Sequence, residues 1–254
     1  MQTEATPLAL RARVAAGDAV HVDGRLRAPH GGGARRLAGA CLASSGLPVA
    51  RWNVADVEDP ALVPPPVVRD WYQAHHDGVP WRVRVPAGTA WPSGRRVLTA
   101  RCLALEPAAF RPAPVPAGVR LRDAHGGDVA VAAAVLAEGL GIQAGLCRAW
   151  LGPQLGSPRH HVVLGDARGT ASAIGVAVRA FDRAGPSVVL AALTVLDRAC
   201  AGLAAALASD LVARGLAGGA RLALRITEDA DEDVAPLLAV GFAEVQRLDV
   251  HEDA

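Results

Sequence analysis

The chain has 254 residues, 51% of them hydrophobic and 20% charged, which excludes a disordered chain and suffices for one large domain or two of ordinary size. The formal net charge is +1, and no run of arginines is dense enough to form a nucleic-acid surface. Arginine exceeds the acids in the first 115 residues and the acids exceed arginine in the rest, so we expect these two parts to attract each other.

The cysteines bear on cellular compartment and metal content. Cys41, Cys102, Cys147 and Cys200 are scattered and form no Cys-x-x-Cys pair, which argues against a disulfide scaffold or a zinc cluster and fits a reducing compartment. The sequence begins without a basic segment followed by an apolar one, and no apolar run reaches the ~18–20 residues of a membrane helix. We therefore expect a cytoplasmic protein that binds no metal, no membrane and no nucleic acid.

The first 115 residues contain one helix-like segment and two strand-like segments. Residues 67–76 predict a helix that carries two adjacent aromatic side chains. Residues 81–85 alternate apolar and basic side chains, which predicts a half-buried strand, and residues 97–105 predict another. The three glycines at 31–33 predict a loop, and not a phosphate loop, because no strand leads into it.

A proline-rich segment at residues 106–118 is the best candidate for a domain boundary, because each proline removes a hydrogen-bond donor and stiffens an extended path. It divides the chain into residues 1–115 and 116–254. The second part begins with a predicted strand at 119–122, a helix at 129–139 that Asp128 caps, and two strands at 161–165 and 172–180 joined by a turn. Such a series predicts a mixed α/β layer structure.

The most informative stretch lies between residues 187 and 242. Apolar residues 188–195 predict a strand that enters a turn of small residues at 200–204. An Ala/Leu helix with leucines four residues apart follows, and a second apolar run spans residues 220–226. A strand that opens into a small-residue loop at a helix N-terminus is a place where backbone N–H groups can hold a phosphate.

This order of elements, with Gly241-Phe242 after a final short helix, resembles the core of the GNAT acyltransferases. The loop Ala199-Cys200-Ala201-Gly202-Leu203-Ala204 matches the family's phosphate-binding pattern at Gly202 and Ala204. The resemblance implies an α/β fold with a mixed, mostly antiparallel central sheet flanked by helices. The first part, through Trp52-Asn53, Trp71 and residues 80–83, is similar to extensions that form a degenerate second copy of that fold.

The resemblance also implies an activity and a cosubstrate. It implies acetyl-CoA as cosubstrate and direct transfer of the acetyl group to a small-molecule or peptide amine, and it leaves a homodimer open. The splaying of two strands at Thr194 and Val195 would provide backbone donors for the thioester carbonyl. The implied cofactor-binding residues comprise a pantetheine set and a pyrophosphate set: Leu193, Thr194 and Val195, then Cys200, Ala201, Gly202, Leu203 and Ala204.

The catalytic residues are less well specified than the cofactor loop. Leu237 stands where relatives commonly have a tyrosine that protonates the leaving thiolate, and residues 187–195 lack the glutamate that often acts there as base. Glu138, Glu228 and Asp182 are the acids close enough to be candidate bases, each weighed against a role as a solvated surface carboxylate.

Two further interpretations stay open. The acidic residues Asp229, Asp231, Glu232 and Asp233 either complement the dipole of the helix that follows or attract a cationic amine. The missing tyrosine and glutamate also permit a catalytically degenerate GNAT-like protein that binds CoA or acts as a structural or regulatory partner.

Overall fold

The computed structural model describes residues 7–76, 78–181, 183–196, 200, 202–228 and 234–253. The helices are α1 (Pro7–Arg27), α2 (Pro65–His76), α3 (Val129–Leu140), α4 (Ala144–Leu151), α5 (Leu203–Ala217) and α6 (Val234–Val240). The strands are β1 (Gly33–Leu37), β2 (Ala40–Ser44), β3 (Val54–Val57), β4 (Trp81–Pro86), β5 (Arg95–Leu105), β6 (Val119–Asp123), β7 (His160–Ala167), β8 (Thr170–Ala180), β9 (Ser187–Val195), β10 (Ala223–Glu228) and β11 (Ala243–Asp253). No helix in the described ranges is long and apolar enough to cross a bilayer.

The strands of the described residues form one sheet in the order β1-β2-β3-β4-β11-β5-β10-β9-β8-β7-β6. Only the pairs β3–β4 and β9–β10 are parallel, and a helix connects the strands of each pair, α2 in the first and α5 in the second. The expectation of a mixed, mostly antiparallel α/β sheet is confirmed.

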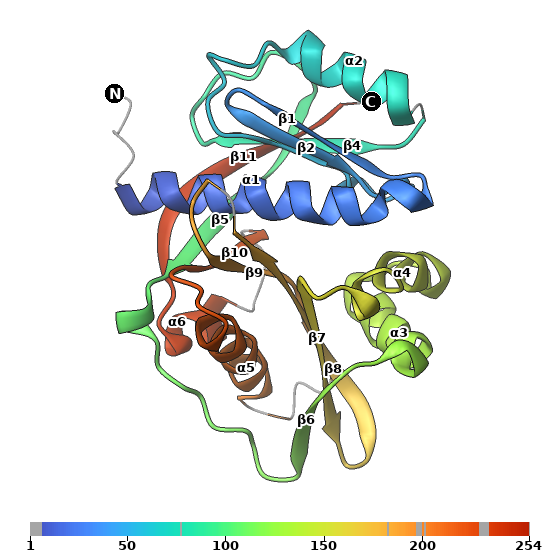
Figure 1. The fold of residues 1–254 in the computed structure, drawn as a ribbon, viewed down its shortest axis with the longest axis vertical. Helices are drawn as coiled ribbons and strands as arrows, with labels where there is room; N and C mark the ends of the chain where they lie inside the picture. Colours follow the sequence, from blue (N-terminus) through green and yellow to red (C-terminus); the bar gives the residue numbers. More distant parts are fainter. Residues whose placement is uncertain are drawn as a thin grey trace.

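The two ends of the chain exchange strands across the middle of the sheet. β5, from the first 115 residues, pairs with β10, while β11, from the end of the chain, pairs with β4 (Figure 1). β5 and β11 pair with each other in antiparallel register. On each side of the central pair β5–β11, the next two strands are parallel to each other and the strands beyond them are antiparallel. The division after residue 115 stays a prediction, since the sheet runs continuously through both parts.

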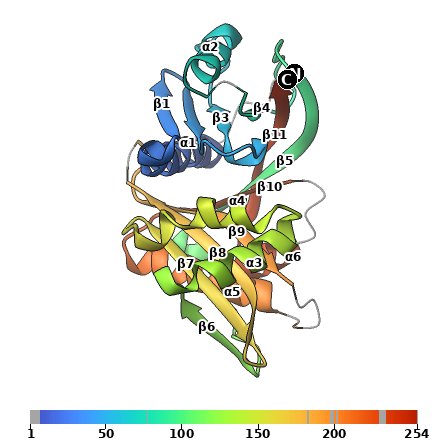
Figure 2. The same cartoon turned by 90° about the vertical axis from the view of Figure 1, so that its right-hand side faces the viewer.

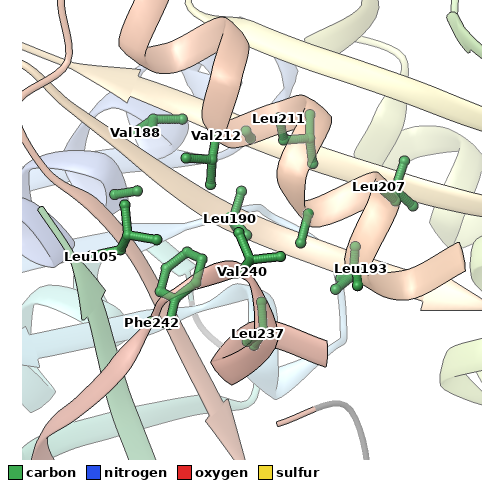
Figure 3. Packing of buried hydrophobic residues seen from close by; sticks show 14 of the residues in the cluster. Leu105, Val188, Leu190, Leu193, Leu207, Leu211, Val212, Leu237, Val240 and Phe242 are labelled. Carbon is green, nitrogen blue, oxygen red and sulfur yellow. The ribbon is translucent and has the colours of Figure 1, made fainter. Parts of the chain in front are cut away.

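Helices cover both faces of the sheet. The alanines of α1 pack on β5, β10 and β11, and α3 and α4 pack on β7 and β8 on the same side (Figure 2). α5 and α6 pack on the opposite face. Figure 3 shows Leu207, Leu211 and Val212 of α5 beside Val188 and Leu190 of β9. The predicted leucine stripe of this helix is therefore part of the core.

The helix α1 was not expected from the sequence. Its buried residues include Arg13, Asp18 and Arg27 as well as alanines, so no apolar stripe of helical period marks it. Arg13 forms an ion pair with the fully buried Asp56 of β3. Polar contacts with the sheet replace part of the apolar packing. The sequence of α1 therefore lacks the apolar stripe by which a helix is recognised.

Candidate active site

A cavity of about 680 Å³ lies where β9 and β10 separate, and residues from both parts of the chain line it. Ala192, Leu193, Thr194 and Val195 of β9 line one side, with Ile226, Thr227 and Glu228 of β10 opposite. Leu193 belongs to the core under α5, whereas Ile226 packs with the core under α1. The cavity therefore reaches from one face of the sheet to the other through the opening between the two strands.

The opening between the two strands begins before Thr194 and Val195 and includes them. Parallel pairing of β9 with β10 ends at Leu190 and Arg225, so the strands separate from Ala191 onward. The register between β8 and β9 skips Ala191, which makes this residue a β-bulge. Ala191 lines the cavity and has a register partner in neither neighbouring strand.

Beyond the bulge, β9 presents one free edge to the cavity. The Leu196 amide donates to the Ser172 carbonyl on the β8 side. Because successive residues of a strand direct their N–H and C=O groups to opposite sides, Leu193 and Val195 direct theirs toward the opening. Thr194 directs its backbone toward β8. Two of the three predicted pantetheine residues thus offer main-chain donors and acceptors to an extended ligand.

The small-residue loop reaches the same cavity at the N-terminus of α5. Cys200, Gly202 and Ala204 line the cavity, and Gly202 adopts a left-handed conformation with φ of 86°. The Leu203 amide donates to the Cys200 carbonyl, and the Leu203 side chain is buried in the core under α5. The amides of Ala204 and Ala205 have no acceptor inside the helix, because the helical hydrogen bonds begin with that from Ala206 to the Gly202 carbonyl. Ala201, predicted as a pyrophosphate ligand, lies outside the described residues.

The structure separates the two described acid candidates. Glu228 ends β10 and lines the cavity, where its Oε1 accepts hydrogen bonds from Arg51 at 2.8 Å and Arg82 at 3.2 Å. Within the described ranges, its Oε2 has no partner. Glu138 is exposed on α3 and lies outside the cavity lining, although the next residue, Gly139, lines it. Asp182, Asp229, Asp231, Glu232 and Asp233 lie outside the residues that the structure describes.

Four arginines line the cavity, and sequence reasoning did not single out any of them. Arg51, Arg82 and Arg84 come from the first part of the chain, and Arg225 comes from β10. Arg82 donates from Nε to Glu252 at 2.7 Å, and Arg84 donates from Nη2 to Asp56 at 2.9 Å. The alternation of residues 81–85 placed both side chains on one face of a strand, but it gave no sign that this face meets β10.

Arg225 lies at the point where β9 and β10 part. Its Nη1 donates to the carbonyl oxygens of Leu190 and Ala191, at 3.0 and 2.9 Å. The guanidinium therefore holds the carbonyls of the last paired residue of β9 and of the bulge, and it puts positive charge there.

A buried polar network fixes the wall that carries Arg51. The short 3-10 turn η2 (Ala50–Trp52) is followed by Asn53, which is 0% exposed. Asn53 makes six side-chain hydrogen bonds: its Oδ1 accepts from Ser44 Oγ, Ser45 N and Ser45 Oγ, and its Nδ2 donates to the carbonyls of Leu47, Val49 and Pro80. Trp52 stacks on Trp150 of α4 with ring centroids 5.2 Å apart. The two parts of the chain thus meet in a defined wall.

The position of the family's tyrosine carries no proton donor here. Leu237 is 1% exposed and packs with Val240 and Phe242 against the core under α5 (Figure 3). The chain's single tyrosine, Tyr72, is buried on α2 and donates to the Ala43 carbonyl at 2.8 Å. Burial raises the pKa of Tyr72 well above its usual range. Among the described residues, no three His, Cys, Asp or Glu side chains are placed to hold a metal.

Solved structures share this architecture. A GCN5-related N-acetyltransferase from Kribbella flavida superposes with a TM-score of 0.68 at 18% identity over 95% of each chain. A GCN5-related N-acetyltransferase from Sphaerobacter thermophilus gives 0.54 at 15% identity, over 85% of this chain and 80% of that one. A tandem GNAT protein from the clavulanic acid biosynthesis pathway gives a TM-score of 0.54 at 16% identity, over 84% of this chain and 77% of that one. This protein has the GNAT fold. No protein-family model and no curated protein sequence matches the chain.

The fold contains two βαβ units, and the helix start of one is better suited to an anion. In the first unit, residues 58–64 join β3 to α2 and include Pro60 and Pro64, and α2 itself begins with Pro65 and Pro66. Prolines lack the N–H groups that would bind an anion at this helix start. In the second unit, β9 leads to Gly202 and a helix start without acidic residues in its first turn. The candidate active site is therefore the one at β9, β10 and α5.

Proposed function

We propose that this GNAT-fold protein is an acyl-CoA-dependent N-acyltransferase that moves an acetyl group from acetyl-CoA to the amine of a small molecule or peptide. The observation that carries the proposal is the cavity at the parting of β9 and β10, which the N-terminus of α5 adjoins. Its volume, about 680 Å³, suits the acyl end of a thioester together with a small acceptor.

The free edge of β9 and the loop before α5 would hold the cofactor. The amides of a pantetheine chain would pair with the main chain of Leu193 and Val195, as an added strand does, with Thr194 beside them. The diphosphate would lie at Cys200, Gly202 and the first-turn amides that follow, where the helix dipole favours negative charge.

Acetyl transfer would take place at the bulge. The nitrogen of the acceptor amine attacks the thioester carbon, a C–N bond forms, and the C–S bond breaks to release the thiolate of CoA. The Ala191 amide supplies a donor for the developing oxyanion, and the Arg225 guanidinium stabilises negative charge at the same place. Glu228 accepts the proton that the amine loses, through its Oε2 or through a water molecule. A role for Glu138 stays a prediction.

A second candidate function is a GNAT-fold protein that binds CoA without catalysis. Two observations favour it. Leu237 leaves the tyrosine position without a proton donor, and the Arg225 guanidinium occupies β9 carbonyls at the start of the opening.

Thiol release from acetyl-CoA over a panel of amines distinguishes the two candidates. We expect release with at least one amine, and we expect Gly202→Glu to abolish it, because a carboxylate would stand where the diphosphate binds. Gly219→Glu is the matched control: Gly219 follows the other end of α5, also has a left-handed φ of 87°, and has open space around it. Binding of acetyl-CoA without thiol release from any amine would favour the non-catalytic candidate.

A further inference from the structure

The acceptor side of the cavity carries more positive than negative charge. Arg51, Arg82 and Arg84 line this side, and Glu228 is the single acid among the lining residues that the structure describes. Glu228 is shared between Arg51 and Arg82, and Arg82 also pairs with Glu252. A cavity with this lining favours a ligand that brings negative charge of its own.

The excess of charge is greatest at Arg84. Asp56, its partner, is completely buried and is also the partner of Arg13, so one carboxylate faces two guanidiniums. Among the residues that the structure describes, the buried Arg84 Nε has no acceptor, and neither do Nε and Nη1 of Arg13. Burial lowers the pKa of Arg84, Asp56 raises it, and the neighbouring Arg13 lowers it again. An anion at the exposed part of the Arg84 side chain, which is 16% exposed, would balance the positive charge that Asp56 shares between two guanidiniums.

Arg84 and Glu228 lie on different strands of the cavity wall, with apolar side chains between them. Leu98 and Ala100 of β5 and Val250 of β11 also line it, between Arg84 on β4 and Glu228 on β10. The unpartnered Oε2 of Glu228 can accept a hydrogen bond from an amine, whereas Arg84 can donate only to an anion or a carbonyl.

We propose that the acceptor is a small amine that also carries an anionic group, a carboxylate or a phosphate, with the anionic group at Arg84 and the amine at Glu228. This inference rests on the proposed acyltransferase function and names its substrate class. The first part of the chain then supplies the anion-binding half of the acceptor site, and the second part supplies the cofactor and the proton acceptor.

Matched acceptor pairs test the inference. Thiol release from acetyl-CoA is measured for glycine against glycinamide, β-alanine against its amide, and O-phosphoethanolamine against ethanolamine, with rates expressed per unprotonated amine. A charged hydrogen bond of the usual strength predicts that the anionic member of a pair has about 10–100-fold higher kcat/KM. The carboxylate and phosphate pairs show which anion the site prefers.

A variant at Arg84 tests whether this residue is the source of the preference for anionic acceptors. We expect Arg84→Gln to lower kcat/KM for the anionic acceptors by more than for their neutral partners, so that the ratio within each pair falls toward one. Arg120→Gln, at an exposed arginine on β6, should leave this ratio unchanged. If Arg84→Gln does not fold, Arg84→Lys replaces it, because lysine keeps the charge and loses the two-pronged geometry of the guanidinium. We then expect a smaller preference for the anionic acceptor over its neutral partner. Equal use of anionic and neutral amines by the unaltered protein would overturn the inference while leaving the acyltransferase function intact.

The inference can also be tested if no amine releases thiol. In that case the melting temperature is measured with each acceptor alone. Stabilisation by the anionic members and not by their neutral partners, lost in Arg84→Gln, supports an anion site. Equal effects of both members overturn it.

Discussion

Asn53 offers the sharpest test of how the cavity wall is held. It is the one asparagine of the chain, and its six side-chain hydrogen bonds join β2, the segment before η2, and the residue that precedes β4. Substitution by alanine removes every one of these bonds. It also leaves buried hydroxyl, amide and carbonyl groups without partners.

The expected cost can be worked from these contacts. A buried hydrogen bond contributes about 1 kcal/mol net, so the six together contribute about 6 kcal/mol. Some loop carbonyls will regain water, which lowers the expected loss for Asn53→Ala to about 3–5 kcal/mol. For a chain of this size, the melting temperature should then fall by about 6–20 °C.

Urea and thermal unfolding measure this loss. Gln143→Ala is the control, because Gln143 is exposed and makes no capping hydrogen bond, and its effect should stay within about 0.5 kcal/mol. Asn53→Asp keeps the acceptor oxygen but sets a charge against three carbonyls, so it should destabilise at least as much as alanine. A loss below about 1 kcal/mol for Asn53→Ala would refute the view that this network holds the wall.

Three further predictions concern other parts of the structure. Asp56→Asn leaves two buried arginines without a full countercharge and should lower the free energy of unfolding by about 3–5 kcal/mol in urea; an effect below about 1 kcal/mol would contradict the shared ion pair. Gly139→Ala places a methyl group against the Thr194 side chain and should weaken acetyl-CoA binding, as measured by calorimetry, whereas Gly145→Ala, which has open space around it, should leave affinity unchanged. Burial, with Arg179 and Arg214 nearby, lowers the pKa of His161 from 6.5, so the folded state loses stability as pH falls below about 6.5. The melting temperature should therefore drop between pH 7.5 and pH 5, and His161→Gln should make this drop smaller.

Local sequence patterns predicted most elements of the second part of the chain. The apolar run at 188–195 lies in β9, and the leucine-rich helix ends at Ala217, directly before Gly218. The run of apolar residues marks the strand, and the leucine spacing with the glycine that follows marks the helix, so no distant contact is needed to recognise either.

The exchange of β5 and β11 could not be predicted in the same way. Both strands are recognisable as strands, but nothing in their own residues says that each pairs with the other part of the chain. Such pairings depend on contacts more than a hundred residues apart in sequence. The sequence likewise gave no account of the Arg13–Asp56 ion pair that joins α1 to β3.

The sequence pattern pointed to the part of the cavity lined by β9 and the loop before α5, and not to the arginines that line the rest of it. Leu193, Val195 and Gly202 lie within one βαβ unit, so a single stretch of sequence contains them. Arg51 and Arg84 reach the same cavity only because the central strands bring the first part of the chain beside β10.

Acetyl-CoA binding tests the central claim most directly. At about 100 times its dissociation constant, a ligand adds roughly 2.7 kcal/mol of stability, which predicts a rise of about 5–10 °C in melting temperature. We expect this rise with the unaltered protein and with Gly219→Glu, and none with Gly202→Glu. An unchanged melting temperature for the unaltered protein at millimolar acetyl-CoA would contradict a cofactor site at the parting of β9 and β10.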